Sequence, residues 1–291
     1  MRINVTGARG MLGEEFVKTL GEKHEVIPFP DREQVDVSDV QAVLNFVRSS
    51  KPDVIVHCAA VRDPDPCELD KDMCWRINCT GTLAVAMAAR EQGCAVVHIS
   101  SDAVFASERD EPYHEYDIPT TPQTIYGHSK LEAERIVQRY LQKYFILRVP
   151  LLFARTGGLR KNNLAKMFEK VRKGEKITAM ADAYSSVCYC FDIARATEKM
   201  LETDFWGIYH VTSEGAVSRA GLMKTALKAA GKDPSFIEET LIADAKKPAQ
   251  RRRYVTLRSL LLEPVFGIRM PDWRESMQHC VDDLRLQGLV D

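Results

Sequence analysis

Tyr126 and Lys130 stand four residues apart in the segment TIYGHSK, residues 124–130. On a helix, side chains at this spacing share one face, so the phenol and the ammonium group would lie side by side. A phenol has a pKa of about 10 in water and a neighbouring cation favours its charged form, so we expect Lys130 to lower the pKa of Tyr126. A phenol in this position can donate a proton to a carbonyl oxygen that becomes negative as its carbon accepts hydride.

Ser101 is the third residue of this predicted catalytic set. It follows AVVHIS, a segment with the composition of a buried strand. Its hydroxyl group could hold the substrate oxygen, and ligands of doubly wound sheets bind beyond the carboxyl ends of the strands. We therefore predict that Ser101, Tyr126 and Lys130 act together. Tyrosine and lysine also occur at this spacing by chance, so the prediction depends on further motifs.

A glycine-rich turn in INVTGARGMLG, residues 3–13, is the second motif. It directly follows a strand-like segment and begins an amphipathic helix, which is the context of a dinucleotide-binding turn. Gly7 would form the tight turn, Gly10 would admit the pyrophosphate to the backbone N–H groups, and Gly13 would let the helix pack on the strand. The predicted cofactor contacts in this segment are Gly7, Arg9, Gly10, Met11, Leu12 and Gly13.

The choice between NADP and NAD depends on the end of the second predicted strand, EVIPF. An NAD site has an acidic residue there for the ribose hydroxyl, whereas a 2′-phosphate favours arginine. This strand ends without an acid, although Asp31 follows closely, and Arg32 and Arg9 could both reach a phosphate. We therefore predict NADP as the cofactor, with NAD as the alternative.

These motifs need a fold that brings them to one edge of a sheet. Strand-like segments alternate with segments of helical period up to about residue 150, which predicts parallel strands covered on both faces. We predict an α/β fold, a doubly wound parallel sheet (Rossmann fold), with a smaller C-terminal α/β substrate region. Residues 1–155, completed by about 186–213, would form the dinucleotide domain, and 156–185 with 214–291 the substrate region. The predicted strands are RINVT, HEVIPF, VIVHCA, AVVHIS and FILRV, and the predicted helices are 11–21, 38–49, 67–92 and 125–143.

The composition limits the classes of partner. The chain has 291 residues, 45% hydrophobic and 28% charged, and a formal net charge of -1, which is ordinary for a globular protein and argues against a nucleic-acid groove. No apolar segment is long enough for a signal peptide or a membrane span, so we expect a soluble, cytoplasmic protein. The eight cysteines include no C-x-x-C pair, so we expect buried thiols rather than disulfides or a metal site.

The order of motifs resembles the extended short-chain dehydrogenase/reductases, most closely the dTDP-4-dehydrorhamnose reductase branch. The matching segments are TGARGMLG, DVSD, VIVHCAA, INCTGT, ISSDAVF, YGHSK and LRVPLLF, and they cover the first half of the chain. The resemblance implies an NADP-binding oxidoreductase that acts on a nucleotide sugar. It also implies Ser101, Tyr126 and Lys130 as the catalytic residues.

The resemblance adds further site residues. It implies adenine contacts at Asp36 and Val37, a cofactor loop at Cys58, Ala59 and Ala60, nicotinamide and sugar contacts at Val149 and Leu151, and a supporting role for Asn78. Asp102 could bind sugar hydroxyls or cap the next turn. The arginines at 251–253, including Arg253, could bind a substrate diphosphate or lie in a solvated loop.

Three functions are consistent with these residues. The first is an NADPH-dependent reductase of the 4-keto group of a nucleotide-linked deoxysugar. The second is a nucleotide-sugar epimerase that retains NAD, and the third is a non-catalytic NADP-binding regulatory subunit similar to the methionine adenosyltransferase beta subunit. Ala103, Leu151 and Arg258 stand where the reductase branch usually has tyrosine, tryptophan and an acidic residue. A 4,6-dehydratase needs a carboxylic acid at 103, which Ala103 does not supply. A homodimer is a further expectation.

Overall fold

The central element of the fold is a six-stranded sheet in which every strand is parallel to its neighbours. A computed structural model describes residues 1–105, 109, 111–157 and 162–290. The strands follow the order β10-β5-β4-β3-β1-β2. Their carboxyl ends therefore meet at one edge of the sheet, as the predicted site requires. The strands are β1 (Arg2–Thr6), β2 (Glu25–Pro28), β3 (Val54–His57), β4 (Ala95–Ser101), β5 (Tyr144–Val149) and β10 (Gly207–His210).

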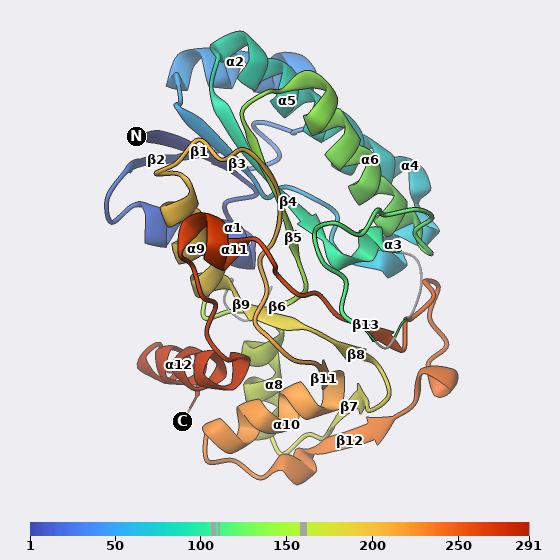
Figure 1. The fold of residues 1–291 in the computed structure, drawn as a ribbon. Coiled ribbons are helices and arrows are strands. Elements are labelled where there is room, and N and C mark those ends of the chain that lie inside the picture. Colours follow the sequence, from blue (N-terminus) through green and yellow to red (C-terminus); the bar gives the residue numbers. More distant parts are fainter. Residues whose placement is uncertain (106–108, 110, 158–161, 291) are drawn as a thin grey trace.

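Helices cover both faces of this sheet (Figure 1). One layer consists of α2 (Val40–Ser50), α5 (Gly81–Gln92) and α6 (Ile125–Tyr140). The other consists of α1 (Met11–Leu20), α9 (Cys190–Met200) and the short α11 (Leu262–Phe266). Successive strand residues point to opposite faces, and both faces are apolar along most of each strand. The predicted doubly wound parallel sheet is therefore confirmed.

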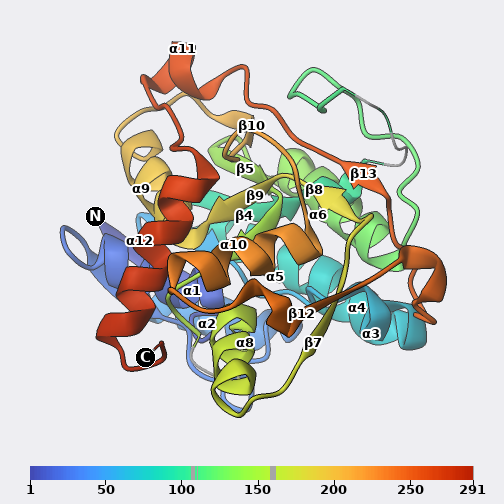
Figure 2. The ribbon, with the colours of Figure 1, turned by 90° about the horizontal axis from the view of Figure 1, so that it is seen from below.

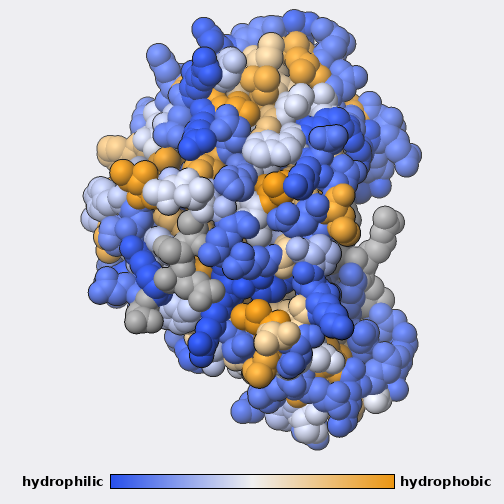
Figure 3. Space-filling view, turned by 90° about the vertical axis from the view of Figure 1, so that its right-hand side faces the viewer, coloured by the Kyte–Doolittle hydropathy of each residue, from blue (hydrophilic) through white to orange (hydrophobic). Residues whose placement is uncertain are grey.

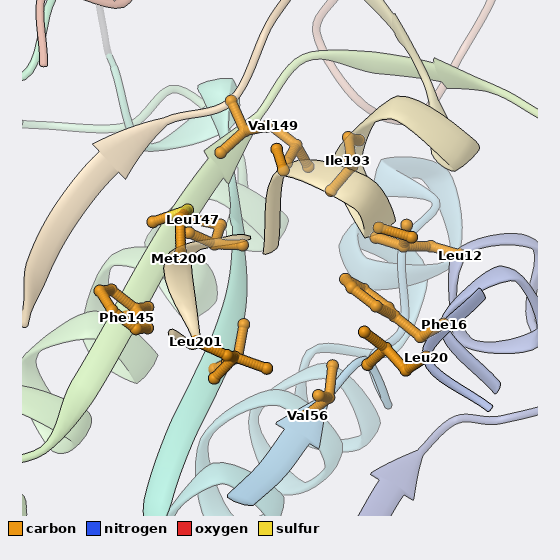
Figure 4. Packing of buried hydrophobic residues seen from close by; sticks show 14 of the residues in the cluster. Leu12, Phe16, Leu20, Val56, Phe145, Leu147, Val149, Ile193, Met200 and Leu201 are labelled. Carbon is orange, nitrogen blue, oxygen red and sulfur yellow. The ribbon is translucent and has the colours of Figure 1, made fainter. Parts of the chain in front are cut away.

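Figure 4 shows the core between the sheet and the layer of α1 and α9. Phe16 and Leu20 from α1, Ile193 from α9, and Phe145 and Leu147 from β5 belong to one buried hydrophobic cluster, and Figure 4 shows Met200 and Leu201 of the α9 segment between the two groups. Burial of apolar side chains is the main favourable term in folding. This packing holds α1, which follows the glycine turn, in a fixed position against the sheet.

The segment predicted as one helix, 67–92, differs from the prediction. It contains α3 (Pro64–Leu69), α4 (Lys71–Trp75), a π-helical turn η1 (Arg76–Thr80) and then α5. The break lies at Asp70, whose carboxylate accepts a hydrogen bond of 2.9 Å from the Met73 backbone N–H and caps a new helix. A side chain that caps a helix competes with continuation of the preceding one, which explains the separate α3.

A smaller lobe follows β5 and has its own hydrophobic core (Figure 2). Its helices are α8 (Asn163–Arg172), α10 (Arg219–Ala229) and α12 (Trp273–Leu286). Its strands form three small sheets: β6 (Leu151–Phe153) with β9 (Val187–Tyr189), β7 (Ile177–Met180) with β12 (Ile237–Thr240), and β8 (Tyr184–Ser185) between β11 (Val217–Ser218) and β13 (Tyr254–Val255). The 3-10 turns are η2 (Asp102–Val104), η3 (Pro234–Phe236) and η4 (Ile242–Asp244).

We retain as a proposal the division into a dinucleotide domain and a substrate region at the predicted boundaries. The return of the chain through α9 and β10 to the first sheet supports it. Residues 158–161, within the predicted substrate region, lie outside the described residues.

The helices and the surface can be compared with those of membrane-spanning proteins. No helix among the described residues is long and apolar enough to cross a membrane. The face shown in Figure 3 is mostly hydrophilic, with hydrophobic residues in small separate patches.

Candidate active site

The three predicted catalytic residues meet where β4 ends and α6 begins. Ser101 is the last residue of β4, while Tyr126 and Lys130 lie on the first two turns of α6. The Thr124 hydroxyl caps this helix by accepting a hydrogen bond of 3.1 Å from the Gly127 N–H. A Cβ atom at Gly127 would lie 2.3 Å from the Ala103 carbonyl oxygen. Only glycine therefore lets α6 approach the loop after Ser101 this closely.

Ser101 contacts both of its functional neighbours. Its side chain lies close enough to Tyr126 to influence the pKa of the phenol. It also donates to the Asp102 carboxylate over 3.0 Å and accepts from the Ala103 N–H over 3.2 Å. These bonds fix the hydroxyl beside the phenol. Ser101, and not Asp102, caps the turn η2, so of the two roles considered for Asp102 only the contact with sugar hydroxyls stays a prediction.

The expected lowering of the Tyr126 pKa by Lys130 is wrong for this structure. Burial raises the pKa of Tyr126 to about 12, and the neighbouring Ser101 side chain only partly opposes this. Lys130 Nζ instead donates to the Ile99 carbonyl oxygen over 2.5 Å. Burial lowers the pKa of Lys130 to about 8, with Glu134 opposing. At neutral pH the phenol is therefore protonated, which suits a proton donor.

The glycine turn fits a dinucleotide. Gly7 has φ +63, and a Cβ atom there would lie 2.8 Å from the Ala59 nitrogen. A Cβ atom at Gly13 would lie 2.2 Å from the Gly7 carbonyl oxygen, so the helix packs directly on the turn. Gly10 precedes α1, which begins without a side-chain cap. The first-turn N–H groups of a helix have no partner within it, so they are free to bind phosphate oxygens.

The side chains of Met11 and Leu12 are buried, and these two residues would contact phosphate only through their N–H groups. The loop after β3 lies against the same turn. The Thr6 hydroxyl accepts hydrogen bonds of 3.1 Å from the N–H groups of Cys58 and Ala59. This loop, which also contains Ala60, is the predicted cofactor loop.

Asn78 connects this cofactor loop to α6. Its side-chain oxygen accepts from the Val61 N–H over 2.8 Å, and its side-chain nitrogen donates to the Ser129 hydroxyl over 2.9 Å. Asn78 is 1% exposed. An amide that bonds to both segments supports their relative position, which is the role that the resemblance implies.

The predicted adenine end contains two ion pairs, Arg32 with Asp36 and Arg9 with Asp31. Burial opposes ionisation of Asp36, but hydrogen bonds from Ser38 and Arg32 lower its pKa to about 2. Arg9 pairs with Asp31. The side chains of Arg9 and Arg32 are 76% and 61% exposed, so both guanidinium groups can turn to a ligand.

Val37 completes the predicted adenine contacts. It packs so closely on the start of α5 that a Cβ atom at Gly81 would lie 3.0 Å from its side chain.

The three adjacent arginines on the predicted substrate side have different surroundings, and the predicted contact of Arg253 with substrate stays a prediction. Arg252 donates to the carbonyl oxygens of Asp102 and Phe105 over 3.0 and 3.2 Å. Arg251 pairs with Asp65 over 2.7 Å. Arg253 is exposed, and its backbone oxygen accepts from the Tyr184 N–H at the start of β8.

Arg219, which sequence reasoning missed, belongs to the same group. Arg219 is exposed, and the packed protein around it, together with Arg251 and Arg252, lowers its pKa while Asp102 opposes this, so these four charges lie near one another. The sequence carries no signal for this grouping, because Arg252 lies 150 residues from Asp102. We name Arg219, Arg251 and Arg252 the arginine cluster.

The remaining predicted contacts lie on β5 and β6. Val149 is buried and pairs in register with Ser101 on β4. Leu151 is half-buried at the start of β6. Val149 therefore lies beside Ser101 at the carboxyl edge of the sheet, and Leu151 begins the next strand two residues later. Within the described ranges no group of three or more histidine, cysteine or acidic side chains could hold a metal ion, and all eight cysteines are free.

Comparison with protein families gives one match along almost the whole chain. The model described as RmlD substrate binding domain matches residues 1–286. A dTDP-4-dehydrorhamnose reductase of Burkholderia thailandensis is 30% identical, with 99% of this chain and all of the relative aligned. A probable dTDP-4,6-dihydroxy-2-methyloxan-3-one 4-ketoreductase of Streptomyces antibioticus is 29% identical over 98% of this chain and 96% of the relative.

Solved structures give the same result. A dTDP-4-dehydrorhamnose reductase of Clostridium acetobutylicum superposes with a TM-score of 0.89 at 32% identity, covering 98% of this chain and all of the other. A Bacillus anthracis dTDP-4-dehydrorhamnose reductase in complex with NADP has a TM-score of 0.89 at 29% identity, covering 97% and 99%. The resemblance inferred from the sequence motifs is confirmed.

Proposed function

This chain belongs to the family of the RmlD substrate binding domain, and we propose that it is an NADPH-dependent reductase of the 4-keto group of a nucleotide-linked deoxysugar. The names of its relatives support the substrate class, since they are reductases of dTDP-linked sugars. The NADP complex of a relative supports the cofactor. The observation that carries the proposal is the position of Ser101 close to Tyr126, at the sheet edge where the glycine turn also lies.

The geometry of the glycine turn and its neighbours supports the proposed cofactor contacts. The turn from Gly7 to Gly13 would hold the pyrophosphate, and Arg9 and Arg32 would pair with a 2′-phosphate. When bound, NADPH supplies hydride to the carbonyl carbon of the substrate. Lys130 would hold the nicotinamide ribose, for which its ammonium group has to exchange the Ile99 carbonyl for a ribose hydroxyl.

Tyr126 would act as the general acid. Its raised pKa keeps the proton on the phenol until the substrate oxygen becomes negative. Ser101 would hold the same oxygen, and the Lys130 cation would stabilise the phenolate that remains after proton transfer. The catalytic residues thus neutralise negative charge at each place where it develops.

The arginine cluster would bind the diphosphate of the nucleotide sugar. Arg219, Arg251 and Arg252 bring three positive charges beside Asp102, next to the catalytic serine. Guanidinium groups match phosphate oxygens in charge and geometry. Asp102 and Leu151 would then face the sugar. Arg253, one residue further along the tail, remains a proposed rim contact.

The test is NADPH oxidation by the purified protein with a panel of 4-keto sugars that includes dTDP-4-dehydrorhamnose. We expect turnover, with NADPH preferred to NADH. Tyr126→Phe should lower kcat by about a thousandfold, within the range for general acid catalysis, and leave the Kd for NADPH unchanged. Tyr140→Phe, at the other end of α6, is the matched control. Equal turnover by the wild type and Tyr126→Phe would contradict the mechanism.

The same assay separates the alternatives. An epimerase would purify with NAD and interconvert sugars without added cofactor. A regulatory subunit would bind NADPH, reduce no keto sugar and co-purify with a partner enzyme. We also propose a cytoplasmic location and a homodimer, and sedimentation analysis of the purified protein tests the second.

A further inference from the structure

A buried ion pair joins the catalytic helix to the sheet. Arg148 on β5 donates to both carboxylate oxygens of Glu134 on α6, over 3.0 and 2.8 Å. The side chains are 4% and 2% exposed. Such a pair forms favourably only when its geometry is good and its remaining hydrogen-bonding groups are satisfied.

The same carboxylate also binds the neighbouring strand. The Ser100 hydroxyl donates to Glu134 over 2.5 Å, and Ser100 lies opposite Arg148 in the pairing of β4 with β5. One carboxylate on α6 is therefore bonded to two adjacent strands at the same level of the sheet. We name Ser100, Glu134 and Arg148 the carboxylate clamp.

The clamp lies directly beside the catalytic residues. Tyr126, Lys130 and Glu134 follow one another at intervals of four residues and so lie along one stripe of the helix. Ser100 precedes Ser101. The clamp thus fixes the helix that carries the phenol and the ammonium group to the strand that carries the catalytic hydroxyl, within one helical turn of Lys130.

We propose that Glu134 is a positioning residue, whose clamp aligns Tyr126 and Lys130 with Ser101 and whose negative charge keeps Lys130 protonated. The effect of the clamp on catalysis rests on the proposed function. The alignment of α6 with β4 and β5 and the effect of Glu134 on the charge of Lys130 depend only on contacts within the chain.

The charges around Lys130 support the second role. Burial lowers the pKa of Lys130 to about 8, and Glu134 is the main group that opposes this. The other titratable groups facing Lys130 are His57 on β3, His98 on β4, Cys58 in the following loop, Cys74 on α4 and Cys79 on η1.

Most of these other groups carry no charge near neutral pH. Burial lowers the pKa of both His57 and His98, so the two imidazoles are neutral. Burial raises the pKa of Cys58 and Cys79, so both remain thiols. Cys74 is the exception, because the neighbouring Cys67 thiol lowers its pKa. Glu134 and Cys74 are therefore the two groups whose effects on Lys130 an experiment must separate.

The first experiment measures the titration of Lys130 without using activity. Protein labelled with ¹³C at the lysine Cε is titrated by NMR, and Lys130→Arg assigns the signal. In Glu134→Gln we expect the Lys130 midpoint to move to lower pH, and the alkaline limb of kcat/KM to move by the same amount. Cys74→Ser should move the midpoint less than Glu134→Gln.

Glu15→Gln is the matched control for breaking a buried ion pair. Glu15 is fully buried and pairs with Arg155 over 2.8 Å, from a helix on the opposite face of the sheet. The Glu15→Gln substitution should lower the free energy of unfolding and leave the titration midpoint of Lys130 unchanged. A change that results only from lost stability would appear in both variants.

The double variant Glu134→Leu/Arg148→Met separates positioning from folding. Replacing both charges by apolar groups is often neutral for stability, whereas removing one partner leaves a buried charge unpaired. We expect a folded protein whose kcat is about ten- to a hundredfold lower, as for small misplacements of catalytic groups, with a KM for NADPH within a factor of about two.

Two results would overturn the proposal: an unchanged Lys130 midpoint in both variants that lack the Glu134 charge, or a full kcat in the folded double variant. The failure of the proposed function gives a different result. A wild-type protein that reduces no keto sugar would disprove the reductase proposal, whereas the NMR titration would still decide whether Glu134 holds the charge on Lys130.

Discussion

The glycine turn and the arginine cluster are built in opposite ways. The turn binds through backbone groups, and its geometry follows from places where a side chain cannot fit, such as Gly13 against the Gly7 carbonyl oxygen. The arginine cluster binds through long charged side chains whose partners are far away in sequence, as Arg251 and Asp65 are. The first region is a property of one short segment, while the second exists only when two lobes meet.

This difference predicts how each region responds to substitution. A Cβ atom that overlaps a backbone atom cannot be accommodated by a side-chain rotation, so the turn should tolerate almost no change. A partly exposed ion pair contributes little on its own because water screens it. The arginine cluster should therefore tolerate the loss of one member with a graded loss of affinity. The four predictions below test this contrast, from the largest expected effect to the smallest.

Gly13→Ala should have the largest effect. The added Cβ atom would lie 2.2 Å from the Gly7 carbonyl oxygen. We expect the free energy of unfolding to fall by about 3 kcal/mol, the upper end for overpacking, and the Kd for NADPH to rise by about a hundredfold. Fluorescence titration and denaturant unfolding measure the two effects. Gly207→Ala is the control, because its nearest neighbour is 3.5 Å away in the Tyr209 ring. Normal NADPH binding by Gly13→Ala would show that the glycine turn tolerates substitution as well as the arginine cluster does.

Arg252→Gln should have an intermediate effect. The variant loses one charged group of the arginine cluster and keeps a polar side chain beside Asp102. A charge-assisted hydrogen bond contributes about 1.5 to 3 kcal/mol, so we expect the KM for the nucleotide sugar to rise at least about tenfold, with a smaller change in kcat. Steady-state kinetics measure this, with the exposed Arg258→Gln as control. A loss confined to kcat would place Arg252 in the chemistry rather than in diphosphate binding.

Arg9→Ser/Arg32→Ser should have a smaller effect, on cofactor choice. Both side chains are largely exposed, so pairing with a 2′-phosphate is screened by water, and we expect the preference for NADPH over NADH to fall by about fivefold. Binding of NADH should not change, since it has no 2′-phosphate. Arg135→Ser is the control, because Arg135 is similarly exposed and also forms an ion pair. An equal loss of both affinities would mean that these arginines do not contact that phosphate.

The smallest expected effect is the pH dependence of the wild type. Lys130, with a pKa of about 8, loses its charge as the pH rises, while Tyr126, with a pKa of about 12, stays protonated. We therefore expect kcat/KM to fall by about half between pH 7 and pH 8, since about half of the lysine is then neutral. A pH profile at constant ionic strength measures this. Constant activity up to pH 9 would show that catalysis does not need the Lys130 charge.

The sequence predicted the main sheet well, because strand-like apolar segments alternate with amphipathic helical segments several times along the chain. It predicted less well where one residue decides the structure, as at Asp70, whose cap separates α3 from α4. The position of Tyr126 and Lys130 on one helix was accessible from their spacing. The direction of the Tyr126 pKa shift was not, because it depends on how much protein surrounds the phenol and on which oxygen Lys130 binds.

The tail shows the same limit. Three adjacent arginines are equivalent in sequence, and the structure separates them: Arg251 binds Asp65, Arg252 binds the segment after Ser101, and Arg253 is exposed. The sequence by itself determined the layers of the fold and the dinucleotide turn, since these follow from local backbone requirements and from the spacing of apolar residues. Only the tertiary structure decided which charges lie close together and that the Tyr126 phenol keeps its proton at neutral pH. Coulomb energy and desolvation depend on distances between segments, and the order of residues in the chain does not specify these distances.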